Sequence, residues 1–231
     1  MNPIAIFYHC LFALGDPPVF LPNAVNIITD QMDHLKQSGL EDAATEIIVG
    51  INGGEESRPI ARLLLPSKAK LVMHGLQCRN ECRTILTLEQ WLPGHEDWYV
   101  LWFHSKGATK PPGDPLATRW RQCMTRHCIF NWRKCVSALD GGYDVAGAHY
   151  MHPPATPPGQ HIMAGNFWFA KASFLLNLPS IMKRERIKQS GIDALESRFE
   201  SEVWLGNGPR LPKIKDYHED WNPSKWATCQ P

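Results

Sequence analysis

The sequence predicts an α/β fold: one domain with a mostly parallel central sheet flanked by helices. Two observations lead to this prediction. Short apolar runs typical of buried strands alternate along the 231 residues with stretches whose apolar residues recur at helical spacing. A chain of this length buries one sizeable core, and it contains no repeat, low-complexity tract or clean linker. We therefore expect a single domain over residues 1–231.

The first part of the chain follows the pattern strand, loop, helix. The apolar run Ile4 to Tyr8 predicts a buried strand. Apolar residues then recur at helical spacing from Pro22 to Ser38, and Gly39 is well placed to end that helix. The same pattern continues with predicted strands at Glu46 to Ile51, Ala69 to His74 and Trp98 to Phe103, and predicted helices at Pro59 to Leu65 and around Ile85, Leu88 and Leu92.

The second part contains a long amphipathic helix and fewer strands. The helix has one apolar face and ends at Gly141-Gly142. Tyr143 to Ala148 reads as a strand, and a Pro-rich loop leads to Ile162 to Phe169. The remainder is predicted to be helical up to a tail rich in Pro and Trp. The apolar face of the long helix consists of Trp120, Met124, Cys128, Trp132, Cys135 and Leu139.

Composition and charge exclude several partners. The formal net charge is +1, so no overall field favours nucleic acid or an anionic membrane. No apolar run approaches the roughly 18 residues of a transmembrane segment, and the N-terminus lacks the basic region of a signal peptide. We expect a soluble, cytoplasmic protein with no nucleic-acid partner and no transmembrane segment.

The cysteines favour reduced thiols over zinc. Seven cysteines is an odd number, and a chain of this length does not need disulfide bonds to fold. Two local groups could suggest zinc, but their spacings match no ribbon or finger, and both fall in predicted helix and core. These groups are Cys78 with Cys82, and Cys123 with His127 and Cys128.

The loop His104-Ser105-Lys106-Gly107 is the first candidate site. It directly follows the most strand-like run, and ligands of open α/β sheets bind outside the carboxyl ends of the strands. Lys106 can meet phosphate charge, and Gly107 lets the backbone approach a ligand closely. An ordinary Lys-Gly turn at a strand end is the alternative.

The second candidate is the segment Ala164-Gly165-Asn166-Phe167-Trp168. Asn166 can form hydrogen bonds with hydroxyl groups, and Trp168 offers a flat face on which a sugar ring could stack. A core role for the tryptophan is the alternative.

The third candidate lies in the segment Arg198 to Trp204. Glu200 and Glu202 flank Ser201 on a predicted helix, where they point about 200° apart, so only one can face the site. That carboxylate could act as a general base. A solvated helix face with ion pairs to Arg198 is the alternative.

The fourth candidate is the tail motif DYHEDW at residues 216–221. His218 and three carboxylates could hold a divalent ion, which in turn would hold a pyrophosphate. A polar tail without a metal is the alternative.

Five segments in order along the chain resemble bacterial and viral glycosyltransferases of polysaccharide biosynthesis that have the GT-A fold. They span about half of the chain. The segments are VLWFHSKGATKP, the helix start WRQCM at Trp120-Arg121, YDVAG, AGNFWFAKASFLLNLP and RFESEVWLG.

The resemblance implies a transferase that moves a sugar from a nucleotide-sugar donor to a glycan or other hydroxyl acceptor, with inversion. Residues 1–110 would bind the donor, through the loop of His104, Ser105, Lys106 and Gly107 together with Arg121 of the second half. Residues 111–231 would bind the acceptor through Gly165, Asn166 and Trp168. Of the two carboxylates, we expect Glu202 rather than Glu200 to be the base.

The resemblance leaves two mechanisms open. Ordinary GT-A enzymes carry an Asp-x-Asp metal motif after the strand that corresponds to Trp98 to Phe103, and this chain has His104-Ser105-Lys106 there. In the slightly favoured version no cofactor is required, and Lys106, helped by Arg119 or Arg121, neutralises the leaving diphosphate. In the other version His104 and His218 bind a divalent metal, manganese or magnesium.

Two other functions compete with glycosyl transfer. A non-catalytic carbohydrate-binding or assembly subunit would keep the fold and the aromatic surface but would have no use for Lys106 beside a nucleotide cleft. A nucleotidyltransferase is disfavoured, because the sequence has neither a Gly-rich phosphate loop nor a paired-Asp metal site.

Overall fold

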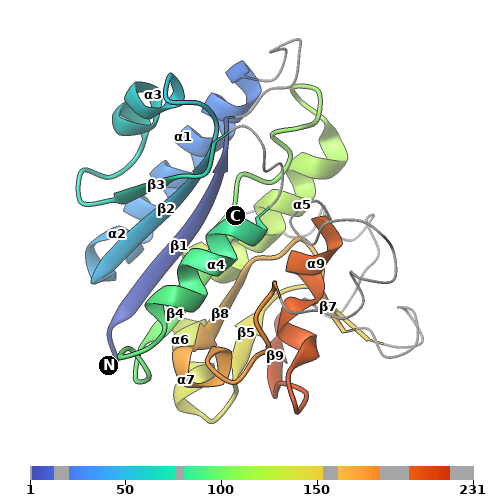
Figure 1. Cartoon of the computed structure of the whole chain (residues 1–231). Coiled ribbons are helices and arrows are strands. Elements are labelled where there is room, and N and C mark those ends of the chain that lie inside the picture. Colours follow the sequence, from blue (N-terminus) through green and yellow to red (C-terminus); the bar gives the residue numbers. More distant parts are fainter. Residues whose placement is uncertain (1, 13–20, 76–80, 153–160, 183–197, 219–231) are drawn as a thin grey trace.

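A seven-stranded, mostly parallel sheet forms the centre of the protein in a computed structural model that describes residues 2–12, 21–75, 81–152, 161–182 and 198–218 (Figure 1). The strand order is β3-β2-β1-β4-β8-β5-β9. The strands are β1 (Ile4–Leu11), β2 (Glu46–Asn52), β3 (Lys70–Met73), β4 (Tyr99–His104), β5 (Val145–Gly147), β8 (Trp168–Lys171) and β9 (Ile214–Asp216).

The first four strands in this order pair in parallel, and so do β5 and β9, whereas β8 is antiparallel to both of its neighbours. Strands from both halves of the chain therefore share one sheet. A separate antiparallel pair is formed by β6 (Tyr150–Met151) and β7 (Ile162–Met163).

Helices cover both faces of the sheet, and the central strand β1 is therefore buried on both sides. Ile6 and Tyr8 face a core shared with α1 and α6, and Ala5 and Phe7 face a core shared with α4. Figure 1 shows α4 and α9 on one side of the sheet and α1, α5 and α6 on the other. The helices are α1 (Leu21–Gln37), α2 (Leu40–Ala43), α3 (Ser57–Leu64), α4 (Cys82–Trp91), α5 (Pro115–Thr125), α6 (Trp132–Asp140), α7 (Ala172–Leu175) and α9 (Arg198–Val203).

The predicted α/β class is confirmed, and so are the strands and helices predicted before residue 110. Gly39 follows α1 with a positive φ of 71°, as expected for a residue that ends a helix. Among the described residues, no helix is long and apolar enough to cross a membrane.

Several elements after residue 110 differ from the prediction, including the short strand β6, which was not predicted. The long helix is divided into α5, a π-helical turn (Arg126–Phe130) and α6, since the backbone leaves helical geometry at Asn131. Ile162 to Phe169 is not one strand, because a turn with a positive φ of 57° at Asn166 separates β7 from β8. The strand β9 was not predicted, because its three half-buried residues form no apolar run.

Candidate functional site

A cavity of about 370 Å³ opens at the carboxyl ends of β1 and β4. The chain runs from β1 to β2 and β3 on one side, and β4 lies on the other, so this is where the strand order reverses. Open α/β sheets bind their ligands at this point, in the crevice outside the strand ends. The lining residues include His9, His104, Lys106, Trp120, Glu81 and Glu202.

Hydrogen bonds connect the loop after β4 to the end of β1. His104 pairs with His9 across the two parallel strands. The Ser105 amide donates to the His9 carbonyl at 3.0 Å, and the Ser105 hydroxyl accepts from the Leu11 amide at 2.9 Å. Ser105 therefore lines the cavity while its hydroxyl also holds the two strand ends in register.

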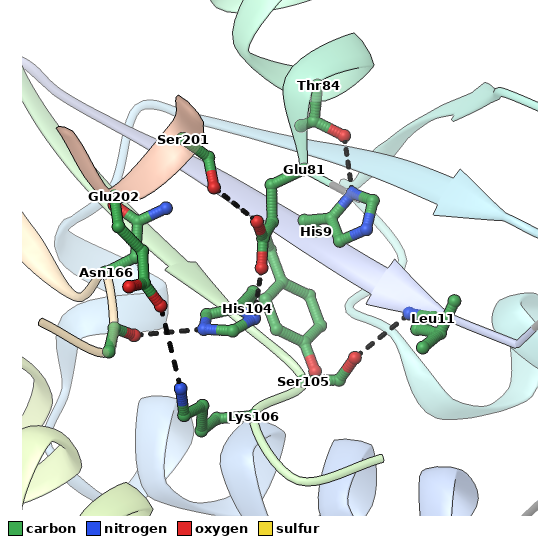
Figure 2. A network of polar contacts seen from close by, with 12 residues as sticks. His9, Leu11, Glu81, Thr84, His104, Ser105, Lys106, Asn166, Ser201 and Glu202 are labelled. Atoms are coloured by element: carbon green, nitrogen blue, oxygen red, sulfur yellow. Dashed lines mark hydrogen bonds and ion pairs between the residues drawn. The ribbon is translucent and has the colours of Figure 1, made fainter. Parts of the chain in front are cut away.

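Lys106 is one of two lysines in the cavity wall, together with Lys110. The Lys106 Nζ lies 3.8 Å from the centre of the Trp120 ring and 3.9 Å from Glu202 Oε1. The Lys106 and Glu202 side chains are 13% and 15% exposed, so water screens their attraction only partly. The structure thus brings together Lys106 and Glu202, which lie far apart in the sequence, in one cavity (Figure 2).

Gly107 and Arg121 support this loop. Gly107 has a φ of 94°, which favours glycine, and its carbonyl accepts from Asn23 Nδ2 at 3.1 Å. Arg121 is buried behind the loop and donates to the Lys106 carbonyl at 3.1 Å. Its predicted contact with the donor is therefore corrected: Arg121 holds the backbone of the loop from behind.

A network of polar contacts connects His104 to three other segments of the chain (Figure 2). His104 Nδ1 lies 2.9 Å from Glu81 Oε1, and His104 Nε2 lies 2.9 Å from the Gly165 carbonyl. Carboxylate and carbonyl oxygens only accept hydrogen bonds, so both ring nitrogens donate and the imidazole carries a positive charge. Ser201 Oγ donates to Glu81 Oε2 at 2.5 Å.

The network determines the charge of Glu81. Burial alone raises the pKa of this carboxyl, but the charge and hydrogen bond of His104, the neighbouring His9 and the hydrogen bond of Ser201 together lower it well below its usual range. Glu81 is therefore ionised, and Glu81 and His104, whose side chains are 14% and 11% exposed, form a mostly buried ion pair in the wall of the cavity.

His9 and His74 remain neutral next to this charged pair. His9 Nδ1 and His74 Nε2 lie 2.8 and 2.9 Å from the hydroxyl of Thr84. Burial lowers the pKa of His9 to about 3 and that of His74 to about 4. Near neutral pH the His9 ring in the cavity wall is therefore uncharged.

The segment containing Gly165, Asn166 and Trp168 is more buried than the sequence suggested. Trp168 is fully buried, stacks on Trp102 and donates through Nε1 to Asn166 Oδ1 at 2.8 Å. The prediction that Trp168 stacks on a sugar is therefore wrong, because its ring belongs to the core. Asn166 is 1% exposed, and its Nδ2 has no hydrogen-bond partner among the described residues.

The backbone conformation and close packing at position 165 require a glycine. The φ of Gly165 is 81°, and a Cβ added there would approach Met124 Sδ to 2.4 Å and Trp120 Nε1 to 2.8 Å. The glycine lets the turn pack on α5 and directs its carbonyl at His104. Its part in acceptor binding stays a prediction.

The predicted metal ligands His104 and His218 do not come together. Both nitrogens of His104 face protein oxygens, so its predicted role as a metal ligand is wrong in this arrangement. His218 instead lies beside Cys123 and His149. The side chain of Glu200 lies outside the described residues, and Glu202 lines the cavity.

The sequence analysis missed Glu81, His9 and Trp120 as site residues. Glu81 stands at the start of α4, and His9 lies within an apolar strand, so neither belongs to a motif. Trp120 was assigned only to the apolar face of a helix. The available signal was that the polar His9 interrupts a buried strand next to the strand that carries His104.

One family model matches most of the chain. It is described as a domain of unknown function, DUF8361, and it matches residues 7–212. The chain belongs to this family. No curated protein matches the sequence of this DUF8361 member.

Solved structures resemble the DUF8361 chain only distantly. They include 4-diphosphocytidyl-2C-methyl-D-erythritol synthase from Anaerococcus prevotii, at 12% identity and a TM-score of 0.49 over 95% of this chain and 90% of the other. CMP:2-keto-3-deoxy-manno-octonic acid synthetase complexed with CTP has 11% identity and a TM-score of 0.41 over 94% and 90% of the two chains. Rv0371c from Mycobacterium tuberculosis has 10% identity and a TM-score of 0.41 over 96% and 90%. At these scores the likeness carries no argument about activity.

The buried ion pair predicts a contrast between two Glu→Gln variants. Glu81→Gln leaves the His104 charge buried without its counter-charge, and we expect it to lower the free energy of unfolding by about 3 kcal/mol or more. Glu55→Gln removes the carboxylate from the exposed Arg58 pair, whose side chains are 43% and 73% exposed, and should have no measurable effect. Urea unfolding at neutral pH measures both, and equal stabilities of the two variants would contradict a charged pair at Glu81.

The neutral histidines predict a loss of stability in mild acid. The pKa values of His9 and His74 are lowered from 6.5, so the unfolded chain binds more protons than the folded one below that pH. The free energy of unfolding should therefore fall as the pH drops below 6.5, by up to about 1.4 kcal/mol per pH unit for each histidine. Urea unfolding between about pH 7 and pH 5 should show a shallower fall for a His9→Asn, His74→Asn double variant. A double variant with the slope of the parent chain would exclude these two histidines as the cause.

Proposed function

We propose that this DUF8361 chain is a glycosyltransferase that moves a sugar from a nucleotide-sugar donor to a glycan or other hydroxyl acceptor. The observation that carries the proposal is the pairing of Lys106 and Glu202 in a cavity at the switch point between β1 and β4. Lys106 is a cation that can stabilise the leaving diphosphate, and Glu202 is a carboxylate that can accept the proton of the acceptor hydroxyl.

Lys106 supports the donor side of this proposal. Sugar transfer breaks the bond between the anomeric carbon and a diphosphate oxygen, and the diphosphate leaves with the electron pair. A positive charge fixed at this point stabilises the negative charge that develops. Lys106 follows β4 directly, and Trp120 and Glu202 hold its amine in the wall of the cavity.

The residues at the end of β4 do not fit a divalent ion bound to the diphosphate. His104 uses both ring nitrogens, Ser105 accepts from Leu11, and Lys106 is itself positive. The proposal therefore assigns neutralisation of the diphosphate to Lys106, and Arg121 supports it only through the loop backbone.

Glu202 supports the acceptor side. The acceptor oxygen attacks the anomeric carbon from the face opposite the diphosphate, and its proton passes to a general base. Before the donor binds, Glu202 lies 3.9 Å from Lys106, and each neutralises the other. A bound diphosphate would attract Lys106 and weaken its ion pair with Glu202. Glu202 could then accept the proton, so donor binding would make the general base available.

The aromatic wall differs from the one that the sequence suggested. Trp120, half-buried in the cavity lining, takes the place of Trp168 as the ring that a sugar or nucleobase could contact. Asn166 is only 1% exposed and is not among the residues that line the cavity, so its contact with the acceptor stays a prediction.

The proposed base is tested by Glu202→Gln. The change keeps the shape of the side chain but removes its basicity, so turnover of the nucleotide-sugar should fall on the order of 10² to 10⁴ while donor affinity is retained. Release of nucleoside diphosphate measures turnover, and equilibrium binding measures affinity. Glu96→Gln, a carboxylate beside β4 at the opposite end of the strand, serves as the control and should be unaffected.

Three results would contradict the proposal. Near-normal turnover in Glu202→Gln would exclude this residue as the base. Release of pyrophosphate from a nucleoside triphosphate would indicate nucleotidyl transfer instead. Glycan binding without consumption of any nucleotide-sugar would indicate a carbohydrate-binding subunit.

A further inference from the structure

Three metal-ligating side chains meet behind the cavity, although they are distant in the sequence. Cys123 lies on α5, His149 follows β5, and His218 follows β9. Their sulfur and nitrogen ligand atoms all lie within 4.8 Å of one another. None of the three lines the cavity described above.

A carboxylate fixes the backbone of both histidines. Asp216 Oδ1 accepts from the amides of His149 and His218 at 3.1 and 3.0 Å, and Asp216 Oδ2 accepts from the Tyr150 amide at 2.9 Å. Asp216 is the last residue of β9, directly opposite Gly147 of β5. The sheet therefore brings the two histidines together, and His149 adopts a φ of 67°, which is uncommon for a residue with a side chain.

The imidazole of His218 carries a buried nitrogen beside this cluster. The Nδ1 of His218 is buried and has no hydrogen-bond partner among the described residues.

We propose that Cys123, His149 and His218 bind a divalent transition-metal ion, with zinc as the best match. One thiolate and two imidazoles form a donor set that suits zinc and not magnesium or calcium. In a tetrahedral zinc site, bond lengths of about 2.0–2.3 Å separate the ligand atoms by roughly 3.3–3.8 Å, so the three side chains need to close by about 1 Å.

His127 lies near the three side chains and is the candidate for a fourth ligand. Its ring centre lies 6.0 Å from that of His218, on the π-helical turn that follows α5. With His127 the ion has four protein ligands, and without it a water takes the fourth position. The metal would then link α5 to the strands β5 and β9.

The metal site is distinct from the diphosphate site. Trp120 lies between them: the Lys106 amine is 3.8 Å from the centre of its ring, and the centre of the His149 ring is 6.4 Å away, in an edge-on arrangement. A metal that fixes His149 would therefore hold the wall on which Trp120 packs. This inference does not depend on the proposed function, because metal binding is measured without any sugar substrate.

The spacing of Cys and His residues along the sequence does not reveal this site, because the three ligands come from three separate elements. The two other cysteines of the long helix are turned to different partners. Cys128 Sγ lies 3.5 Å from the Phe167 carbonyl, and Cys135 Sγ lies 3.4 Å from the His127 carbonyl. Cys128 is thus a buried thiol on the same helical segment that can serve as a matched control.

Metal content of the full chain tests the proposal. After equilibration with zinc and removal of the excess, the parent chain and Cys128→Ser should retain about one zinc per chain, measured by mass spectrometry of the element. Cys123→Ser and His218→Gln should retain at least tenfold less. Circular dichroism establishes that each variant is folded, and His218→Gln, at a half-buried position, provides the answer if Cys123→Ser unfolds.

Cobalt gives a second readout of the ligands themselves. The cobalt-loaded parent chain should show the near-ultraviolet absorption of a cobalt–thiolate bond together with the visible bands of tetrahedral cobalt. His218→Gln should weaken both, and Cys128→Ser should leave them unchanged. A parent chain that retains no zinc and shows no cobalt–thiolate absorption would overturn the proposal, as would full zinc content in a folded Cys123→Ser variant.

Discussion

The buried ion pair between Glu81 and His104 is the interaction on which the cavity depends. Through it, the start of α4 contacts the end of β4, the turn at Gly165 and the helix α9, since Ser201 donates to the same carboxylate. Two charges in a buried position are costly unless both are paired and hydrogen-bonded, and here each polar atom of the pair has a partner. The pair therefore specifies how four segments meet beside the strand ends.

Because α9 is held at Ser201, the next residue, Glu202, faces the cavity. Because the loop after β4 is held at His104, Lys106 extends into the same space and approaches Glu202. The proposed chemistry thus relies on Lys106 and Glu202, and the neighbouring Glu81–His104 pair determines where these two side chains lie. In a similar way, Asp216 holds the backbone of the two histidines of the candidate metal site at the β9 edge of the sheet.

The sequence was sufficient to predict the fold class and the loop at the end of β4, because both are local patterns: apolar runs, helical spacing and a polar turn after a buried strand. It also identified Lys106 and Glu202, which the structure brings into one cavity. It could not identify Glu81 or the grouping of Cys123 with His149 and His218, since these contacts form only when distant segments pair. Trp168 was misread because an aromatic side chain has the same local signature in a core as at a surface.

The central claim, that Lys106 forms the diphosphate end of a nucleotide-sugar site, is tested most directly by thermal shift with a panel of nucleosides, nucleoside diphosphates and nucleotide-sugars. A ligand that binds the folded state raises the melting temperature by mass action. We predict that only compounds with a diphosphate raise it, without need of manganese, and that Lys106→Met removes the effect while the exposed Lys36→Met retains it. Equal shifts in the parent chain and Lys106→Met, or shifts that appear only with manganese, would contradict this account.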